Sequence, residues 1–260
     1  MKQRFFTYFL LLLTFSQNQL VAERVAFFYA LSQDIAAFEK LAGPPITSTK
    51  IGESSIQTYL VGKHRIYAAK MGSGSVQTAV TAQALLTQNR CDLVISCGPA
   101  GGLGEALKVG EWVVANKAVA FQKGSVASSG FSLTPQSEID VAAPDLVALL
   151  PEQLPKADIA SGELFVASDD YRRELSSLTN CSLVEMNLFG LATAMRHHDL
   201  VGIHLRVVSD LADANASRDF RSFAEKYDGR GGSLVYQILE NLPSSGLSPV
   251  EYPNLRRLLE

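Results

Sequence analysis

Two alternating patterns of hydrophobic and polar residues run along the chain after about residue 22. Short, nearly continuous apolar runs are typical of strands that are buried on both faces. Most are separated by segments whose apolar residues recur every three or four positions, which is the spacing of a helix with one buried face. The strands expected from the first pattern are 24–31, 56–61, His64–Lys70, 92–97, 111–119, 157–160, 183–186 and 200–208. The helices expected from the second follow residue 34 and cover 76–88, 187–198 and 220–242, the last interrupted at 229–232.

Strands mostly separated by helices predict an α/β protein, here a single-domain three-layer α/β/α fold over residues 23–242 with a mixed central sheet. Gly62-Lys63 separates two strand-like runs and predicts a hairpin between them. A Gly- and Ser-rich stretch at 123–134 predicts a surface loop, a kind of segment that often covers sites. The tail at 243–260 contains three prolines and is read either as an ordered arm or as a frayed end.

The first 22 residues have a different character. Lys2 and Arg4 form a short basic region, an apolar run follows at 5–15, and a polar stretch leads to Ala22. This order is typical of a secretory signal peptide, so we expect cleavage after Ala22 and export to the periplasm or the medium. The apolar run is too short for a comfortable permanent membrane span, and no cysteine offers a lipoprotein anchor. The alternative is a buried N-terminal helix.

Composition, charge and cysteine content reduce the number of function classes that fit the chain. The 260 residues are 47% hydrophobic and carry a net charge of −3, without a basic cluster outside the N-terminus, which argues against a nucleic-acid partner. The cysteines are an odd number, Cys91, Cys97 and Cys181, and buried free thiols are favoured over a Cys97–Cys181 bridge. The pair His197-His198 is interpreted as a solvated helix end, so neither a metal site nor a cofactor is expected.

Glycine-rich turns and carboxylates supply the candidate chemistry. Gly72-Ser-Gly74 could bring backbone amides to a phosphate or a sugar at a helix N-terminus, although a tight turn needs the same glycines. The run from Gly98 to Gly102 offers amides at the end of a central strand but matches neither GxGxxG nor a P-loop. Asp210, beside Ser209 at a strand end, is either a general acid with a raised pKa or a cap of the next turn. Asp34 alone would be interpreted as a helix-dipole carboxylate.

A series of motifs along the mature chain carries a resemblance. They are GSGSV at 72–76, SCGPAGGL at 96–103, LKVGEWVV at 107–114, ASGELFV at 160–166, VEMN at 184–187 and RVVSDLAD at 206–213. In this order they resemble the nucleoside phosphorylase/nucleosidase superfamily, and most of all the 5′-methylthioadenosine/S-adenosylhomocysteine nucleosidases. The resemblance runs from about Val25 to Leu242 and implies hydrolysis of the N-glycosidic bond of a purine nucleoside, with a 5′-substituted nucleoside such as methylthioadenosine as one candidate.

The resemblance also implies a role for each matching residue. Asp210 would protonate the purine N7 as the glycosidic bond breaks, and Asp34, where the family usually has glutamate, would orient the attacking water. Phe165 would stack on adenine beside the backbone of Val166, and Met186 would lie under the ribose. The remaining substrate contacts that we expect are Gly98, Glu185, Asn187 and Ser209.

Asn187 departs from the family pattern, which has a glutamate there to accept hydrogen bonds from ribose hydroxyls. Asparagine still accepts one such bond but brings no charge. Losing a contact that strengthens in the transition state would cost about 2–4 kcal/mol, or roughly 10² to 10³ in rate. Phosphorolytic relatives have arginines near the glycine-rich turns, and none stands there in this chain, so hydrolysis is favoured. The alternatives are a nucleoside-binding or storage protein with impaired catalysis and a phosphorylase. We also expect a homodimer.

Overall fold

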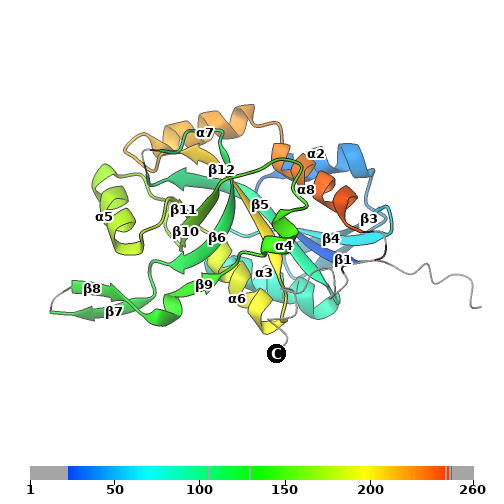
Figure 1. Ribbon diagram of the computed structural model, residues 1–260, viewed down its shortest axis with the longest axis horizontal. Coiled ribbons are helices and arrows are strands. Elements are labelled where there is room, and N and C mark those ends of the chain that lie inside the picture. Colours follow the sequence, from blue (N-terminus) through cyan, green and yellow to red (C-terminus); the bar gives the residue numbers. More distant parts are fainter. Residues whose placement is uncertain (1–22, 105, 129, 244, 246, 248–260) are drawn as a thin grey trace, which may run out of the picture.

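The computed structural model describes residues 23–247, apart from 105, 129, 244 and 246. The predicted signal peptide and most of the predicted tail therefore lie outside the described residues. Strands form the middle of the molecule and helices cover both faces (Figure 1). The strands are β1 (Arg24–Tyr29), β2 (Thr47–Ile51), β3 (Ser54–Val61), β4 (His64–Lys70), β5 (Leu93–Gly102), β6 (Trp112–Ala120), β7 (Gly124–Ala127), β8 (Gly130–Leu133), β9 (Glu138–Asp140), β10 (Lys156–Ser161), β11 (Leu183–Glu185) and β12 (Gly202–Asp210).

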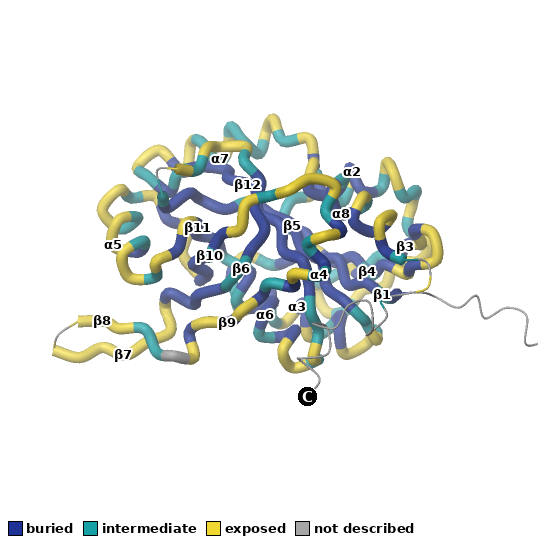
Figure 2. The backbone as a smooth tube through the Cα atoms, in the orientation of Figure 1, coloured by how far each residue is buried: buried dark blue, intermediate teal, exposed yellow. Residues whose placement is uncertain are grey.

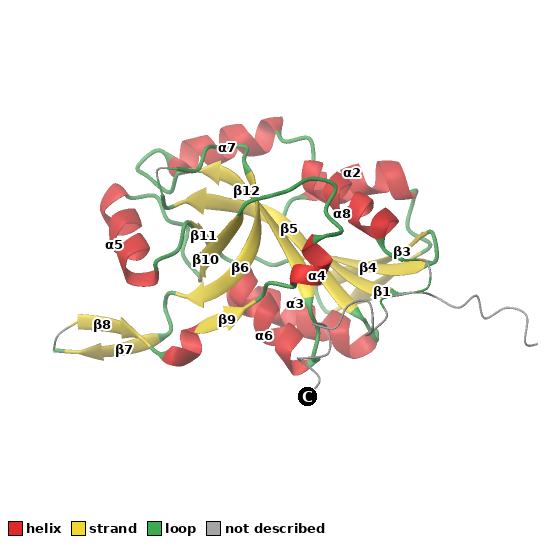
Figure 3. Ribbon diagram, viewed as in Figure 1, coloured by secondary structure: helices red, strands yellow, loops and turns green. Residues whose placement is uncertain are grey.

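The helices fill the connections between strands (Figure 3). They are α2 (Ser32–Ala42), α3 (Ser75–Gln88), α4 (Pro144–Val147), α5 (Asp169–Thr179), α6 (Leu188–His197), α7 (Ala216–Lys226) and α8 (Arg230–Asn241), with a short 3-10 helix at Pro135–Ser137. The three-layer α/β/α fold predicted from the sequence is confirmed. No helix in the described part of the chain is both long enough and apolar enough to cross a membrane.

One ten-stranded mixed sheet organises the fold, with the order β11-β10-β6-β12-β5-β1-β4-β3-β2 and with β9 paired to β6. The strand β11 also pairs with β5, so the sheet closes on itself at that end. Because β1, β5 and β12 run parallel to one another, their carboxyl ends meet at one edge. A ligand site is expected at such an edge of an open α/β sheet.

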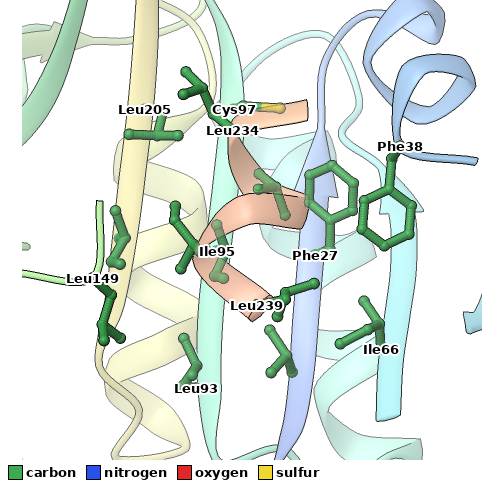
Figure 4. Packing of buried hydrophobic residues seen from close by; sticks show 14 of the residues in the cluster. Phe27, Phe38, Ile66, Leu93, Ile95, Cys97, Leu149, Leu205, Leu234 and Leu239 are labelled. Carbon is green, nitrogen blue, oxygen red and sulfur yellow. The ribbon is translucent and has the colours of Figure 1, made fainter. Parts of the chain in front are cut away.

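Alternate residues of β1 show why this strand is apolar throughout. Phe27 packs in a cluster with Phe38 of α2 and Leu234 of α8, as Figure 4 shows, while Phe28 packs on the opposite face with residues of α3 and α6. Burial of both faces removes the alternation that marks a half-exposed strand. The tube in Figure 2 is accordingly buried along the central strands.

The predicted surface loop at 123–134 is a hairpin instead, made of β7 and β8 with exposed residues along nearly all its length (Figure 2). It projects from the body as an arm (Figure 1). Its Ser- and Gly-rich composition hides the strand pattern, because neither face is buried against the body of the protein. The predicted interruption of the last helix also lies earlier, between Lys226 and Arg230, and Gly231 and Gly232 belong to α8.

Candidate active site

A cavity of about 120 Å³ lies where β5, β11 and β12 end. The loop after β10 and the helix α7 complete its wall. It is lined by Pro99, Ala100, Gly101, Phe165, Val184, Glu185, Met186, Asn187, Ser209, Asp210 and Phe220. Six predicted site residues are therefore brought together, whereas Gly98, Val166 and Asp34 are not among the lining residues.

Asp210 is the titratable group best placed for proton transfer in this cavity. It is the last residue of β12 and only 2% exposed. Ser209 Oγ donates to one carboxylate oxygen at 2.8 Å, and the amide of Ala212 donates to the other at 2.9 Å. Burial raises the pKa of Asp210 above its ordinary value, against the lowering effect of these two hydrogen bonds. A carboxyl with a raised pKa at the wall of a pocket suits a general acid.

The backbone around Asp210 is shaped to hold that carboxyl. A Cβ at Gly101 would lie 2.9 Å from Asp210 Oδ1, so only glycine leaves room for the acid. Ala212 has a φ of 53°, in the left-handed region that costs about 1–2 kcal/mol for a residue with a Cβ. This conformation accompanies the hydrogen bond from the Ala212 amide to Asp210, and strain of this kind is concentrated at functional sites.

Glu185 lines the cavity, but its carboxylate is occupied. It accepts hydrogen bonds from the amides of Asn187 and Leu188 at the start of α6, and from the guanidinium of Arg206 at 3.1 and 3.2 Å. The side chains of Glu185 and Arg206 are 2% and 1% exposed. This buried ion pair fixes the turn that carries Met186 and Asn187, so Glu185 orients its neighbours while its own oxygens are held within the protein.

Asn187 lines the cavity, and one polar atom of its side chain has no partner in the described part of the chain. Its Nδ2 donates to the carbonyl of Gly72 at 2.6 Å and to Thr78 Oγ1 at 2.7 Å, across to the turn before α3. Its Oδ1 has no partner among the described residues and is free to accept a hydrogen bond from a ligand. The amide therefore fits both its protein neighbours and a hydroxyl donor.

Aromatic residues form the outer wall. Phe165 is 47% exposed, and its ring meets that of Phe220 edge to face, with centroids 5.8 Å apart. Sequence reasoning missed Phe220, because an aromatic residue in an amphipathic helix is normally interpreted as core. Val166 is buried in a cluster with Leu103 and Phe121, but its backbone has no hydrogen-bond partner among the described residues. That backbone remains able to pair with the edge of a base.

Asp34 has other neighbours. It is fully buried at the start of α2, where Tyr227 Oη donates to Oδ1 at 2.6 Å, and Oδ2 has no partner among the described residues. Burial raises the pKa of Asp34 to about 6, although the bond from Tyr227 lowers it. Neither Asp34 nor Tyr227 lines the cavity. The role of Asp34 in orienting water stays a prediction.

Gly98 and the turn before α3 serve packing in this structure. A Cβ at Gly98 would lie 2.8 Å from that of Ala30. Gly74, with a φ of 96°, leaves room for the carboxylate of Glu163, which accepts from the amide of Val76 at 3.0 Å. The N-terminus of α3, where an anionic ligand could bind, therefore already holds a carboxylate of the protein itself.

Other candidate chemistry lies elsewhere. Two larger hollows lie in other parts of the surface. One, of about 570 Å³, is lined by residues that include Arg90 and His198, and the other, of about 510 Å³, by residues that include Phe223 and Lys226. Asp210 lines neither of them. We assign the site to the smaller cavity because it holds the buried acid. Within the described ranges no group of three or more His, Cys, Asp or Glu could hold a metal ion, and the three cysteines are free.

The chain belongs to the phosphorylase superfamily, whose family model matches residues 24–240, which confirms the resemblance drawn from the sequence. It is similar to 5′-methylthioadenosine/S-adenosylhomocysteine nucleosidase of Haemophilus influenzae strain PittEE, with 23% identity over 223 residues, 82% of this chain and 97% of the relative. The corresponding protein of Staphylococcus saprophyticus is 26% identical over 188 residues, 68% of this chain and 82% of the relative.

Two solved structures from Helicobacter pylori share the fold. One is 5′-methylthioadenosine/S-adenosylhomocysteine nucleosidase in complex with a pyrrolidine ligand, and the other is futalosine hydrolase. Each superposes with a TM-score of 0.78 at 23% identity and covers 85% of this chain and 99% of the neighbour.

Proposed function

We propose that this protein hydrolyses the N-glycosidic bond of a purine nucleoside, releasing free base and sugar. The observation that carries the proposal is Asp210, a buried carboxyl with a raised pKa at the wall of the cavity. Protonating the base makes it a better leaving group from an oxocarbenium-like sugar, and a positioned acid of this kind contributes about 10² to 10⁴ in rate. The nucleosidases and the futalosine hydrolase among the similar proteins support this class of reaction.

The other walls suit a nucleoside in a definite orientation. Phe165 and Phe220 offer ring faces and edges to a base, and the unpaired backbone of Val166 offers a donor and an acceptor to its edge. Asn187 Oδ1 can accept from a ribose hydroxyl. A 5′-substituted substrate such as methylthioadenosine is the finer proposal, and the names of the relatives support it.

Water is proposed as the acceptor of the sugar because the anion position is taken. Glu163 occupies the N-terminus of α3, and a phosphate there would meet a carboxylate at close range. Arg206, buried near the strand ends, is already paired with Glu185. Both observations favour hydrolysis over phosphorolysis.

A second candidate is a nucleoside-binding protein with impaired catalysis. Asn187 favours it, because a neutral amide supports the positive charge of the transition state less than a carboxylate. The position of Asp34 outside the pocket lining favours it too.

Base release separates these candidates. The purified mature chain is incubated with methylthioadenosine, adenosine and inosine, with and without phosphate, and free base is measured. Release that does not depend on phosphate supports hydrolysis, and release that requires phosphate supports a phosphorylase. Binding by calorimetry without release would contradict the enzyme proposal. Asp210→Asn is the matched control for catalysis by a contaminant.

We further propose a homodimer through the face that carries the arm of β7 and β8. Val126 on this arm is 82% exposed and Phe131 is 40% exposed, which favours a protein partner. The side-chain oxygen of Gln122, just before the arm, accepts from the amide of Glu163 at 2.6 Å, so the arm connects to the loop of Phe165. Light scattering should give a dimer that Val126→Asp dissociates. The control is Thr49→Asp, at an exposed polar position of β2.

Export is proposed from the first 22 residues. The full chain expressed in a bacterial host should yield an extracytoplasmic protein whose first residue is Glu23. An arginine in place of Leu12, inside the apolar run, should retain the uncleaved chain in the cytoplasm. Cytoplasmic wild-type protein that still begins at Met1 would contradict the proposal.

A further inference from the structure

Two side chains of α5 hold the turn that follows Asp210. Arg172 Nη1 donates to the carbonyl of Leu211 at 3.3 Å. Asp169 Oδ2 accepts from the amide of Ala214 at 3.3 Å. One contact joins a cation to a backbone acceptor, and the other joins a carboxylate to a backbone donor. We call this pair of contacts the α5 clamp.

The residue between the two contacts is strained. Ala212 has a φ of 53°, and a conformation of this kind persists only where the surrounding structure over-determines it. Its carbonyl accepts from the amide of Ser168, the N-cap of α5, at 3.2 Å. Its side chain is buried in one cluster with Leu175 of the same helix. Because the clamp adds contacts on both sides of Ala212, its conformation depends on α5.

The Ala212 amide is part of the surroundings of the acid. It donates to Asp210 Oδ1 at 2.9 Å. A Cβ at Gly101 would lie 2.9 Å from that Oδ1 and 3.2 Å from Ala212 Cβ, so the carboxyl and the turn pack against the same strand. A general acid has to lie within hydrogen-bond reach of the atom that it protonates, and a misplacement of about 1 Å can cost on the order of 10² in rate. A shift of the turn therefore affects catalysis, although neither Arg172 nor Asp169 lines the cavity.

We propose that the α5 clamp positions the general acid. Arg172 and Asp169 are then positioning residues, which act through the turn at 211–214 and the Ala212 amide on the carboxyl of Asp210. The inference rests on the proposed function for the role of Asp210 as the acid. Since the loop that carries Phe165 runs directly into α5, the clamp also fixes the aromatic wall of the cavity relative to the acid.

Two substitutions on α5 test the clamp. Arg172→Met should lower kcat for base release from methylthioadenosine about tenfold, and Asp169→Ala, whose bond is exposed, about threefold or more. The Kd for adenine, measured by calorimetry, should stay within about threefold, because neither residue touches the ligand. The matched controls are Arg173→Met and Asp170→Ala. These two residues are exposed on the same helix and pair with each other, so both variants should keep kcat within about twofold.

The pKa of Asp210 separates positioning from a direct effect of charge. The hydrogen bond from the Ala212 amide lowers this pKa, so loosening the turn should raise it by about half a unit or more in both Arg172→Met and Asp169→Ala. Asp213 and Asp219, whose charges raise it, are unchanged in both variants. A direct charge effect would instead raise the pKa on loss of the cation and lower it on loss of the carboxylate.

Carboxyl ¹³C NMR measures that pKa, with the signal of Asp210 assigned by its loss in Asp210→Asn, and urea unfolding checks that each variant is folded. A lowered pKa in Asp169→Ala, or a pKa and kcat in Arg172→Met that match those of Arg173→Met, would overturn the proposal. If the wild type releases no base, the proposed hydrolysis fails, and the pKa of Asp210 in the four variants still tests the clamp.

Discussion

Replacing Asp210 by asparagine tests the acid with little disturbance of its surroundings. Ser209 has one hydroxyl hydrogen, yet its Oγ lies 2.8 Å from Asp210 Oδ2 and 3.2 Å from the carbonyl oxygen of Ala100. In Asp210→Asn the amide nitrogen can donate to Ser209 Oγ, which frees the hydroxyl hydrogen for Ala100. The amide of Ala212 keeps its acceptor. Asparagine therefore reproduces the hydrogen bonds of a protonated Asp210 without a proton to give.

The expected magnitudes follow from this comparison. With no buried polar group left unpaired, the free energy of unfolding should change by less than about 1 kcal/mol. The kcat for base release should fall by about 10² to 10⁴, or roughly 2.7–5.5 kcal/mol of transition-state stabilisation. The wild-type rate should fall as the pH rises through the raised pKa of Asp210, and the variant should lack that dependence.

Urea unfolding, nucleoside binding by calorimetry and the pH profile of kcat measure these quantities on the same protein. A fall in kcat of less than tenfold, with binding intact, would show that Asp210 is not the acid. A loss of several kcal/mol of stability would show that the hydrogen-bond argument around Ser209 is wrong.

Three further predictions concern neighbouring positions. Asn187→Glu should not raise kcat, because a glutamate carboxylate cannot donate to the Gly72 carbonyl as the Asn187 amide does at 2.6 Å. A rise of at least tenfold in steady-state base release would instead show that Asn187 is a damaged catalytic position. Gly101→Ala should lower kcat by about tenfold or more, since its Cβ would lie 2.9 Å from Asp210 Oδ1; unchanged kinetics would contradict the steric argument. Burial raises the pKa of Asp34 from 3.8 to about 6, so the wild type should lose about 2.4 kcal/mol of stability between pH 4 and pH 8, and Asp34→Asn should not. Urea unfolding of the two proteins measures this, and the same dependence on pH in both would refute it.

Much of the fold could be predicted from sequence because its strands are apolar on both faces. The hairpin at Gly62-Lys63 was predicted correctly, and Gly62 has the positive φ that such a turn needs. The strand predicted at 92–97 was too short, because β5 continues to Gly102. Glycines normally interrupt a strand, but here β11 and β12 pair with Gly101 on both sides.

The site was harder to predict where it depends on distant partners. The position of Asp210 at a strand end is local information and was predicted from the sequence. The occupied carboxylate of Glu185 depends on Arg206 of another strand, and the surroundings of Asp34 depend on Tyr227, 193 residues away. Closure of the sheet brings Glu185 to Arg206, and packing of α8 on α2 brings Tyr227 to Asp34. Neither of these tertiary contacts can be predicted from the spacing of residues along the chain.

Glu163 has a consequence for the direction of the reaction. Phosphorolysis replaces the bond between sugar and base by a bond between sugar and phosphate, and the reaction is reversible. A phosphorylase therefore also makes nucleosides when base and sugar phosphate accumulate. Hydrolysis in water releases a free sugar and does not return. Because a carboxylate of the chain lies at the N-terminus of α3, the proposed reaction is a one-way degradation whose extent does not follow the phosphate supply.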